Sequence, residues 1–457
     1  MPAHVISIDT PGLGDRSYLI CDGAVAAVVD PQRDVDRLVA AAAAHGARIT
    51  DALETHIHND YVSGGLELAR RCGTRYWVAA AEEVGFDRRS VSDGDRITLG
   101  AVTLRAVRTP GHTPHHLAFV LEEGGRALGV FTGGSLLYGT VGRTDLLGEA
   151  RAAELARAQY RSCRRLALEL PVDVAVYPTH GFGSFCASTP ANAVEASTIG
   201  VEAGTNLALT VDDEDEFIAS LLGGLTAYPS YYAHMGDINR AGPPPAPLDP
   251  PRLLDLEALR ERVRAGEWVV DLRDRRAFAP VHLPGTVSVE LSDLFAPYLG
   301  WAMRWGTPLS LLAPSADEVA EAVRMLARIG IDELMGAAIA SPEDLARAGA
   351  EVAGYPVTTF SDLADAWAAT PEILVLDVRR RDEWDSGHLV GAIHIPFSDL
   401  EARLAEVPPA PQVWVHCAAG FRASIGASLL DRAGRRAVLV NDVWAHAEEV
   451  GLPIVGS

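Results

Sequence analysis

Residues 55–61 read T-H-I-H-N-D-Y and directly follow A-L-E-T, which is predicted to end a strand. Residues i and i+2 of an extended chain point the same way, so His56 and His58 are expected to present two imidazoles to one cation. Ordinary loop hydrogen bonding is the alternative for any single His, but further His-bearing segments also end apolar runs. These segments are T-P-G-H-T at 109–113 and Y-P-T-H-G at 177–181, with V-F-T-G-G-S at 130–135 between them. The predicted metal ligands are His56, His58, Asp60, His112 and His180.

Short β-rich runs and helical stretches alternate around these segments. Strands are expected at residues 5–9, 17–21, 24–30, 97–107, 117–121 and 127–132, and helices at 34–45, 64–72 and 149–169. This order predicts an α/β layered domain over residues 1–240, with two sheets and helices outside them. The next residues, 241–252, include P-P-P-A-P-L-D-P-P, which indicates a stiff linker because proline fits neither helix nor central strand.

An internal repeat follows the linker. V-V-D-L-R at 269–273 leads to H-L-P-G-T, and V-L-D-V-R at 375–379 leads to H-L-V-G-A, with Asp and His 11 residues apart in both copies. Each copy begins with an amphipathic helix and then alternates strand and helix. The pattern predicts two doubly wound parallel-sheet domains, at residues 253–350 and 356–457.

The second copy contains a candidate nucleophile. Residues 413–424 read V-W-V-H-C-A-A-G-F-R-A-S, so an apolar strand runs into Cys417 and a helix follows. Loop N–H groups at a helix N-terminus lower a thiol pKa, and a nearby Arg422 stabilises anionic sulfur, whereas a buried structural Cys is the alternative. The first copy has Ala313 or Pro314 at the matching place. The predicted catalytic pair is Cys417 and Arg422, and the predicted substrate-binding loop is Ala418, Ala419, Gly420 and Phe421.

Composition excludes several function classes. A length of 457 residues suggests about three domains, and the net charge of −22 disfavours nucleic acid and membrane surfaces as partners. All basic residues are Arg, which excludes a Schiff-base lysine. The five Cys form no C-x-x-C pair, which favours a reducing cytoplasm, and we expect no secretory signal or membrane helix.

Residues 1–240 resemble the metallo-β-lactamase superfamily, whose ligand signature is H-x-H-x-D-H, then G-H, an Asp after a T-G turn, and a late H-G. V-G-R-T-D-L at 141–146 is typical of the persulfide dioxygenase branch. The resemblance implies an αββα sandwich and one iron, with His56 and His112 as two of its ligands.

Two positions depart from that signature. Tyr61 replaces a His, which argues against a dinuclear hydrolase, and Gly134 replaces the acidic ligand. A set of His56, His58 and His112 remains, with Asp60 as the nearest spare carboxylate, for Fe²⁺ or zinc. The alternative is a domain that binds no metal. Replacing Gly134 by Asp is expected to rebuild the facial triad.

Residues 356–457 resemble the rhodanese family through D-V-R-x-x-x-E-W-x-x-G-H-L-x-G-A at 377–392 and the loop C-A-A-G-F-R. The resemblance implies that Cys417 carries sulfane sulfur. Asp377, Arg379 and His388 are expected to brace the fold. The first copy has no thiol at the matching place and is expected to be structural or to serve docking.

The main hypothesis is a sulfur-metabolism enzyme that is persulfide dioxygenase-like and a sulfurtransferase. It would act on small thiols and persulfides such as glutathione persulfide, and on thiosulfate. One alternative is a sulfurtransferase with a metal-site-degenerate N-terminal domain, and another is a sulfur-relay or redox-sensing module that uses Cys417. The oligomeric state stays open, with a homodimer among the options.

Overall fold

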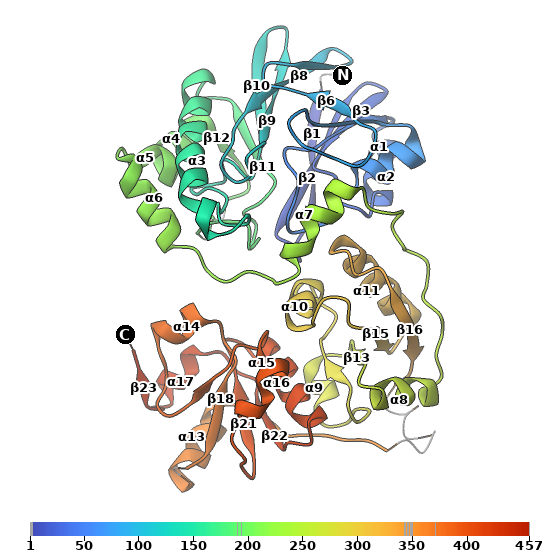
Figure 1. The fold of residues 1–457 in the computed structure, drawn as a ribbon, viewed down its shortest axis with the longest axis vertical. Helices are drawn as coiled ribbons and strands as arrows, with labels where there is room; N and C mark the ends of the chain where they lie inside the picture. The colour runs from blue at the N-terminus through green and yellow to red at the C-terminus, as the bar shows by residue number, and fades with distance from the viewer. Residues whose placement is uncertain are drawn as a thin grey trace. The chain divides into compact units, whose positions relative to one another are not determined.

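The computed structural model describes residues 3–189, 191–192, 194–341, 344, 347, 351–370 and 372–456. The chain forms two compact units, Met1–Pro247 with Ala327–Gly330 and Leu248–Leu326 with Ile331–Ser457 (Figure 1). The limits predicted at residues 1, 350 and 457 lie outside the described residues. Within the described chain, no helix is both long and apolar enough to cross a membrane.

Two sheets build the first unit, with orders β1-β2-β3-β4-β5-β6 and β12-β11-β10-β9-β8-β7. The first contains β1 (His4–Thr10), β2 (Asp15–Asp22), β3 (Val25–Val29), β4 (Arg48–Leu53), β5 (Arg75–Ala79) and β6 (Arg89–Val91). The second contains β7 (Arg96–Leu99), β8 (Val102–Arg108), β9 (Leu117–Glu123), β10 (Arg126–Gly133), β11 (Ala175–Pro178) and β12 (Ser197–Thr198). The helices are α1 (Asp36–Ala44), α2 (Gly65–Cys72), α3 (Glu149–Glu169), α4 (Ile199–Thr205), α5 (Leu207–Thr210), α6 (Glu214–Gly223) and α7 (Tyr232–Ala241).

The alternation of side chains along each strand explains the layers. Tyr18 of β2 packs in the core that it shares with Phe131 of the second sheet, whereas the next residue, Leu19, packs with Leu38 of α1. Behind the second sheet, Val176 packs in the cluster that α3 and α6 cover. Because successive side chains face opposite ways, each sheet buries one face against the other sheet and one against helices. This confirms the predicted αββα sandwich.

One predicted element is wrong. Residues 97–107 were expected to form a single strand, but they form the antiparallel hairpin β7–β8, in which Leu99 pairs with Val102. Gly100 makes the turn with a φ of 58°, a conformation that glycine adopts without strain. Both strands alternate apolar and polar residues, so the run looks continuous in the sequence, and Gly100 was the signal for the turn.

Parallel sheets build the second unit, with orders β14-β13-β15-β16 and β17-β22-β21-β18-β20, and β19 pairs with β23. The strands are β13 (Trp268–Asp271), β14 (Val287–Ser288), β15 (Leu309–Ala313), β16 (Leu334–Ile339), β17 (Val357–Thr358), β18 (Leu374–Asp377), β19 (His388–Leu389), β20 (Ile393–His394), β21 (Val413–His416), β22 (Ala437–Val440) and β23 (Ile454–Val455). The helices are α8 (Leu256–Arg264), α9 (Arg275–Phe278), α10 (Phe295–Ala302), α11 (Ala316–Arg328), α13 (Phe360–Ala369), α14 (Arg381–Ser386), α15 (Leu400–Arg403), the 3₁₀ helix η1 (Leu404–Glu406), α16 (Phe421–Arg432) and α17 (Ala445–Glu449). The two parallel sheets confirm the predicted doubly wound domains.

Candidate functional site

Three strands of the first unit, from both sheets, are each followed by a buried histidine. His56 follows β4, His112 follows β8 and His180 follows β11, and their exposed fractions are 2%, 1% and 0%. The chain at His56 is bent rather than extended. His56 and His58 nevertheless come together, because their ring centroids lie 4.0 Å apart.

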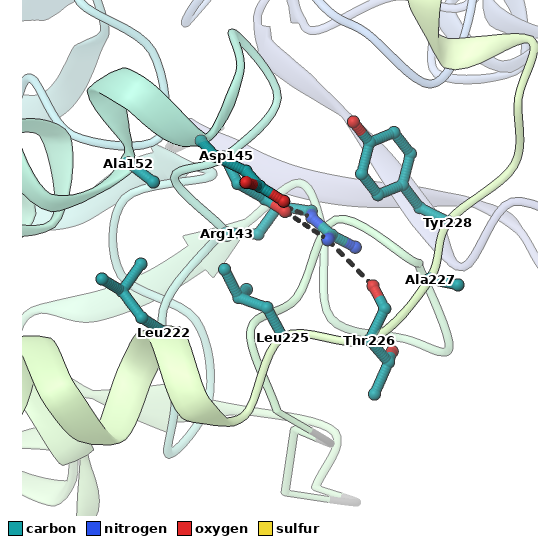
Figure 2. Close-up of a pocket in the computed structure, with 9 residues that line it drawn as sticks. Arg143, Asp145, Ala152, Leu222, Leu225, Thr226, Ala227 and Tyr228 are labelled. Carbon is teal, nitrogen blue, oxygen red and sulfur yellow. Dashed lines mark hydrogen bonds and ion pairs between the residues drawn. The ribbon is translucent and has the colours of Figure 1, made fainter. Parts of the chain in front are cut away.

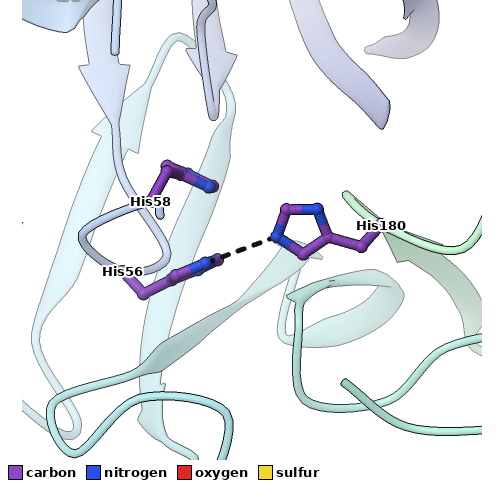
Figure 3. A group of neighbouring side chains, drawn as sticks. All are labelled: His56, His58 and His180. Carbon is purple, nitrogen blue, oxygen red and sulfur yellow. Dashed lines mark hydrogen bonds between the residues drawn. The ribbon is translucent and has the colours of Figure 1, made fainter. Parts of the chain in front are cut away.

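The three imidazoles form one cluster. The ring centroids of His56 and His112 lie 4.8 Å apart. The ring centroid of His180 lies 5.4 Å from that of His56 and 5.3 Å from that of His112. Figure 3 shows His180 pointing toward His56 and His58 from a different strand end. The Nε2 atoms of His56 and His180 are 3.4 Å apart, a separation that two ligands of one metal ion commonly have.

In each of the three rings, the Nδ1 atom forms a hydrogen bond with a neighbouring residue, and the Nε2 atom faces the cluster. The Nδ1 partners are Thr55 Oγ1 at 2.8 Å for His56, the Arg143 carbonyl oxygen at 2.8 Å for His112, and Asp15 Oδ1 at 2.7 Å for His180. The carbonyl and carboxylate can only accept, and Thr55 donates its own proton to Asp30, so all three Nδ1 atoms donate. The His112 Nε2 atom has no hydrogen-bond partner within the described chain. Metal-ligating histidines show this same pattern of outer partners.

His58 is oriented differently. Its Nε2 atom lies 2.9 Å from the Tyr61 hydroxyl, 3.3 Å from an Asp30 oxygen and 3.2 Å from a Glu54 oxygen. Burial alone would lower the pKa of His58, but Asp30 and Glu54 outweigh it and raise the pKa to about 9. The residue that replaces the family histidine, Tyr61, thus helps to turn the Nε2 atom of His58 toward carboxylates. The Nδ1 atom has no hydrogen bond among the described residues and lies 3.9 Å from an Asp60 oxygen.

Carboxylates surround His180. Asp60 Oδ2 lies 3.2 Å from the His180 Nδ1 atom, beside the Asp15 contact, and both Asp60 oxygens lack hydrogen-bond partners among the described residues. Burial alone would lower the pKa of His180, but Asp60 and Asp15 raise it well above its ordinary value. The pocket therefore favours a positive charge at His180, which either a proton or a metal cation on Nε2 supplies.

Gly134 lies against the cluster, at the position where the family signature has an acidic ligand. A Cβ atom at residue 134 would lie 2.2 Å from the Cδ2 atom and 2.7 Å from the Nε2 atom of His112. His112 therefore fills the space that a side chain at residue 134 would need. Gly134→Asp therefore requires a shift of the His112 ring, and the expectation that it rebuilds a facial triad stays a prediction.

Arg143 connects the cluster with a neighbouring pocket. Its carbonyl holds His112, and its guanidinium donates to both Asp145 oxygens at 2.7 Å and to the Thr226 carbonyl at 2.9 Å. The guanidinium also lies over the Tyr228 ring, 4.2 Å from its centre. Figure 2 shows these groups lining a pocket of about 560 Å³.

Three residues of this site were not predicted from the sequence. His116 is buried among the rings, but its Nδ1 atom contacts Thr109 and its Nε2 atom accepts from the Gly134 N–H, so both nitrogens have protein partners. Asp15 and Cys186 were not predicted. Cys186 follows His180 by six residues in the loop G-F-G-S-F-C, and that short separation was the available signal.

The residues present fit a divalent cation. Within the described residues, four buried groups of ligand atoms lie close enough to share a metal ion, and His180 belongs to three of them. Imidazoles with carboxylates suit zinc or ferrous iron. The unpartnered Nε2 atom of His112 is a second indication, because buried polar atoms are otherwise almost always hydrogen-bonded.

In the second unit, Cys417 occupies the loop between β21 and α16. The thiol is 2% exposed, and its sulfur accepts a hydrogen bond of 3.1 Å from the Gly420 N–H. Gly420 has a φ of 88° and packs tightly against Asn441, so a larger residue fits poorly at this turn. The loop thus directs the Gly420 N–H at a sulfur atom that lies beside a helix N-terminus.

Arg422 lies in the first turn of α16, but it pairs with Glu383. Its guanidinium donates to both Glu383 oxygens, at 2.8 Å to Oε1. Burial alone would lower the pKa of Arg422, but Glu383 and the negative field of Cys417 raise it above its ordinary value. The carboxylate partner was not predicted, because it comes from α14, 39 residues away.

The copy without a thiol reaches the Cys417 loop. Arg275 of α9 donates to Asn441 at 2.7 Å and approaches the Ala419 carbonyl at 3.5 Å. Tyr298 of α10 packs against Phe421, with ring centroids 5.4 Å apart. Residues 253–350, expected to be structural or to serve docking, thus contribute side chains beside the loop.

Comparison with known proteins agrees with this geometry. The model of the metallo-beta-lactamase superfamily matches residues 11–180, and that of the rhodanese-like domain matches residues 360–444. A probable metallo-hydrolase of Burkholderia pseudomallei is 32% identical over 214 residues, which cover 40% of this chain and 68% of the relative. Human mitochondrial persulfide dioxygenase ETHE1 is 33% identical over 145 residues, covering 32% of this chain and 54% of the relative. A hydroxyacylglutathione hydrolase of Cereibacter sphaeroides is 32% identical over 207 residues, which cover 44% of this chain and 73% of the relative.

Among solved structures, a metallo-beta-lactamase from Staphylococcus aureus superposes with a TM-score of 0.66 at 27% identity, covering 75% of this chain and 100% of that one. The similarity extends beyond the first unit, because the first unit alone is shorter than the matched share. The predicted resemblances are confirmed. The chain belongs to the metallo-beta-lactamase superfamily and carries a rhodanese domain at its C-terminal end.

Proposed function

We propose that this chain is an enzyme of sulfur metabolism that carries sulfane sulfur on Cys417 and acts on persulfides at a metal held by the histidine cluster. The observation that carries the proposal is the Cys417 loop, in which the Gly420 N–H donates to the sulfur at the start of α16. Such donors stabilise a thiolate and a persulfide better than a thiol. The named activity of the persulfide dioxygenase relative supports the link between the two sites.

The transfer step is a thiol exchange. The Cys417 thiolate attacks the outer sulfur of thiosulfate, the sulfur–sulfur bond of the donor breaks, and sulfite leaves with the electron pair. An acceptor thiolate such as glutathione then attacks the outer sulfur of the Cys417 persulfide and regenerates the thiolate. Arg422 would hold the anionic donor, and its contact with Glu383 sets how much positive charge is available.

We assign the metal to the Nε2 atoms of His56, His112 and His180. Bound iron would supply oxygen activation for persulfide oxidation, and bound zinc would supply Lewis acidity. The chain's own residues orient the site, because Asp15, Thr55 and the Arg143 carbonyl fix the three rings. The pocket beside Arg143 is the proposed place for the organic part of a thiol such as glutathione.

Metal content and oxygen uptake test the first unit together. Purified protein loaded with Fe²⁺ is expected to hold about one equivalent and to consume oxygen with glutathione persulfide. His112→Ala should lose both, whereas His45→Ala, which changes an exposed histidine, should keep both. An iron-loaded protein that consumes no oxygen would remove the dioxygenase activity and leave the sulfurtransferase.

Gly134 favours a second candidate, a metal-dependent hydrolase of thiol-linked substrates. Without a carboxylate at residue 134, the cluster lacks the two-His-one-carboxylate set that non-haem iron oxygenases use. The hydroxyacylglutathione hydrolase relative supports this candidate. Tight zinc binding with hydrolysis of a glutathione thioester, and no oxygen uptake, would select it.

A further inference from the structure

Cys186 lies beside the histidine cluster. Its sulfur and one imidazole nitrogen each of His112 and His180 form one group, in which the three ligand atoms lie within 4.8 Å of one another. All three residues are buried, with exposed fractions of at most 1%. The Nε2 atom of His112 has no hydrogen-bond partner among the described residues, which is the second sign of a ligand here.

Arg143 fixes both Cys186 and His112. Its backbone N–H donates to the Cys186 carbonyl at 2.8 Å, and its own carbonyl accepts from the His112 ring at 2.8 Å. The Arg143 guanidinium also donates a hydrogen bond of 3.1 Å to the carbonyl of Phe185, the residue before Cys186. One residue thus holds the backbone of the cysteine and the ring of the histidine together, as a ligand pair requires.

The charge around Cys186 opposes a free thiolate, because burial, Asp60 and Asp15 raise the pKa of the Cys186 thiol well above its ordinary value, so a thiolate here needs a bound cation to balance it. His112 occupies the space beside Gly134, so no carboxylate approaches from that side. Asp60 and Asp15 contact the Nδ1 atom of His180, which is the nitrogen that faces away from the proposed metal. A dication bound by neutral imidazoles alone would keep its full charge, and an anionic ligand would reduce it.

We propose that Cys186 is a metal ligand together with His112 and His180, and that its thiolate replaces the carboxylate absent at residue 134. The inference rests on the metal assignment of the proposed function. On binding, the S–H bond breaks, a metal–sulfur bond forms and the proton leaves to solvent, so the oxidation state of the metal does not change. A thiolate ligand favours zinc or iron over magnesium and calcium.

Metal X-ray absorption of the zinc-loaded full chain tests the proposal without any substitution. A zinc–sulfur distance of about 2.3 Å is expected beside zinc–nitrogen distances of about 2.0–2.1 Å. In the cobalt-loaded protein, a near-ultraviolet thiolate-to-cobalt band should appear at one equivalent. Cys186→Ser should abolish the band and weaken zinc binding by about tenfold to a hundredfold.

Cys163→Ser is the matched control, because that thiol is also buried but donates to the Ser135 carbonyl at 3.3 Å. It should keep the sulfur distance, the band and the affinity. Bound zinc with only nitrogen and oxygen neighbours would overturn the Cys186 proposal and leave the histidine site intact. A wild-type chain that binds no zinc or cobalt, with His112→Ala unchanged from it, would overturn the metal assignment itself.

Discussion

The two copies in the second unit share a buried ion pair and differ in the loop that follows the next strand. Arg273 donates to both oxygens of Asp271, and Arg379 donates to both oxygens of Asp377, at distances of 2.6–3.1 Å. Each pair closes the end of the equivalent strand, β13 or β18. The pair is therefore part of the framework, and its presence says nothing about whether a copy performs chemistry.

The repeated histidines behave in the same way. His282 stacks on Phe278 with centroids 4.0 Å apart, and His388 stacks on Trp384 at 3.6 Å. Both Nδ1 atoms lie 3.0–3.1 Å from the carbonyl of the residue on which they stack. These contacts agree with the expectation that the histidines brace turns.

The copies differ after β15 and β21. β15 ends at Ala313, and Pro314 and Ser315 lead into α11, whereas β21 ends at His416 and Cys417 begins a loop with the left-handed Gly420. The comparison shows that the same framework can hold a loop with a thiol or a loop without one. The difference is confined to a few residues, and substitutions in matched pairs can test it.

The largest effect is expected from the thiol. Cys417→Ser should reduce sulfur transfer from thiosulfate to cyanide by at least about a thousandfold, because no other residue of the loop can carry sulfur. Cys72→Ser, which changes an exposed thiol, should leave the rate unchanged. Ala313→Cys should not confer activity on Cys417→Ser, because the first copy lacks the loop glycine and arginine. Substantial transfer in that double variant would break the comparison.

The framework pair is expected to affect stability instead. Asp377→Asn should destabilise the second unit by about 3 kcal/mol, because it leaves the buried Arg379 charge unpaired. Asp271→Asn should have a similar effect in the other copy, and urea unfolding would measure both. A loss of stability for only one of the two variants would show that the ion pair does not play the same role in both copies.

The stabilisation by the Asp377–Arg379 pair is expected to depend on pH. Burial alone would raise the pKa of Asp377, but His416 and Arg379 hold it below its ordinary value. The stabilisation that ionised Asp377 gives the folded state is therefore fully present above the ordinary carboxyl pKa of about 3.9. It is lost as pH falls through the lower pKa that Asp377 has in the folded protein. The difference between wild type and Asp377→Asn should stay constant from neutral pH to about pH 5 and shrink below that.

The charge beside the loop is expected to change donor binding. Arg422→Ala should raise the KM for thiosulfate by about tenfold or more, which corresponds to about 1.4 kcal/mol, and should change the KM for a neutral donor less. Glu383→Gln should lower the KM for thiosulfate, because it frees the Arg422 charge. Equal changes for charged and neutral donors would make Arg422 a structural residue.

The smallest effect is expected from the other copy. Arg275→Ala should lower kcat by about threefold to fivefold, since one hydrogen bond of about 1 kcal/mol to Asn441 is lost behind the loop. The neighbouring Arg276 is exposed, so Arg276→Ala should leave kcat unchanged. Identical kinetics for both variants would mean that residues 253–350 do not support the loop.

The order of β-rich runs and helical stretches predicted the layers, and the internal repeat with its alternation of strand and helix predicted both parallel sheets. These patterns depend on residues that are near one another in the sequence. The metal cluster was predicted as a set of residue types, but its ring orientations were not. His180 is oriented by Asp15, which lies 165 residues away in the chain. The sequence also shows that Gly134 lacks a carboxylate, but only the structure shows that His112 fills that space.

Mass spectrometry of the intact chain, followed by peptide mapping, tests the central claim most directly. After incubation with thiosulfate and removal of the excess, the account predicts a gain of one sulfur atom on the peptide that contains Cys417, and loss of that sulfur when glutathione is added. A gain confined to the exposed Cys72, or transfer that proceeds while Cys417 stays unmodified, would contradict it.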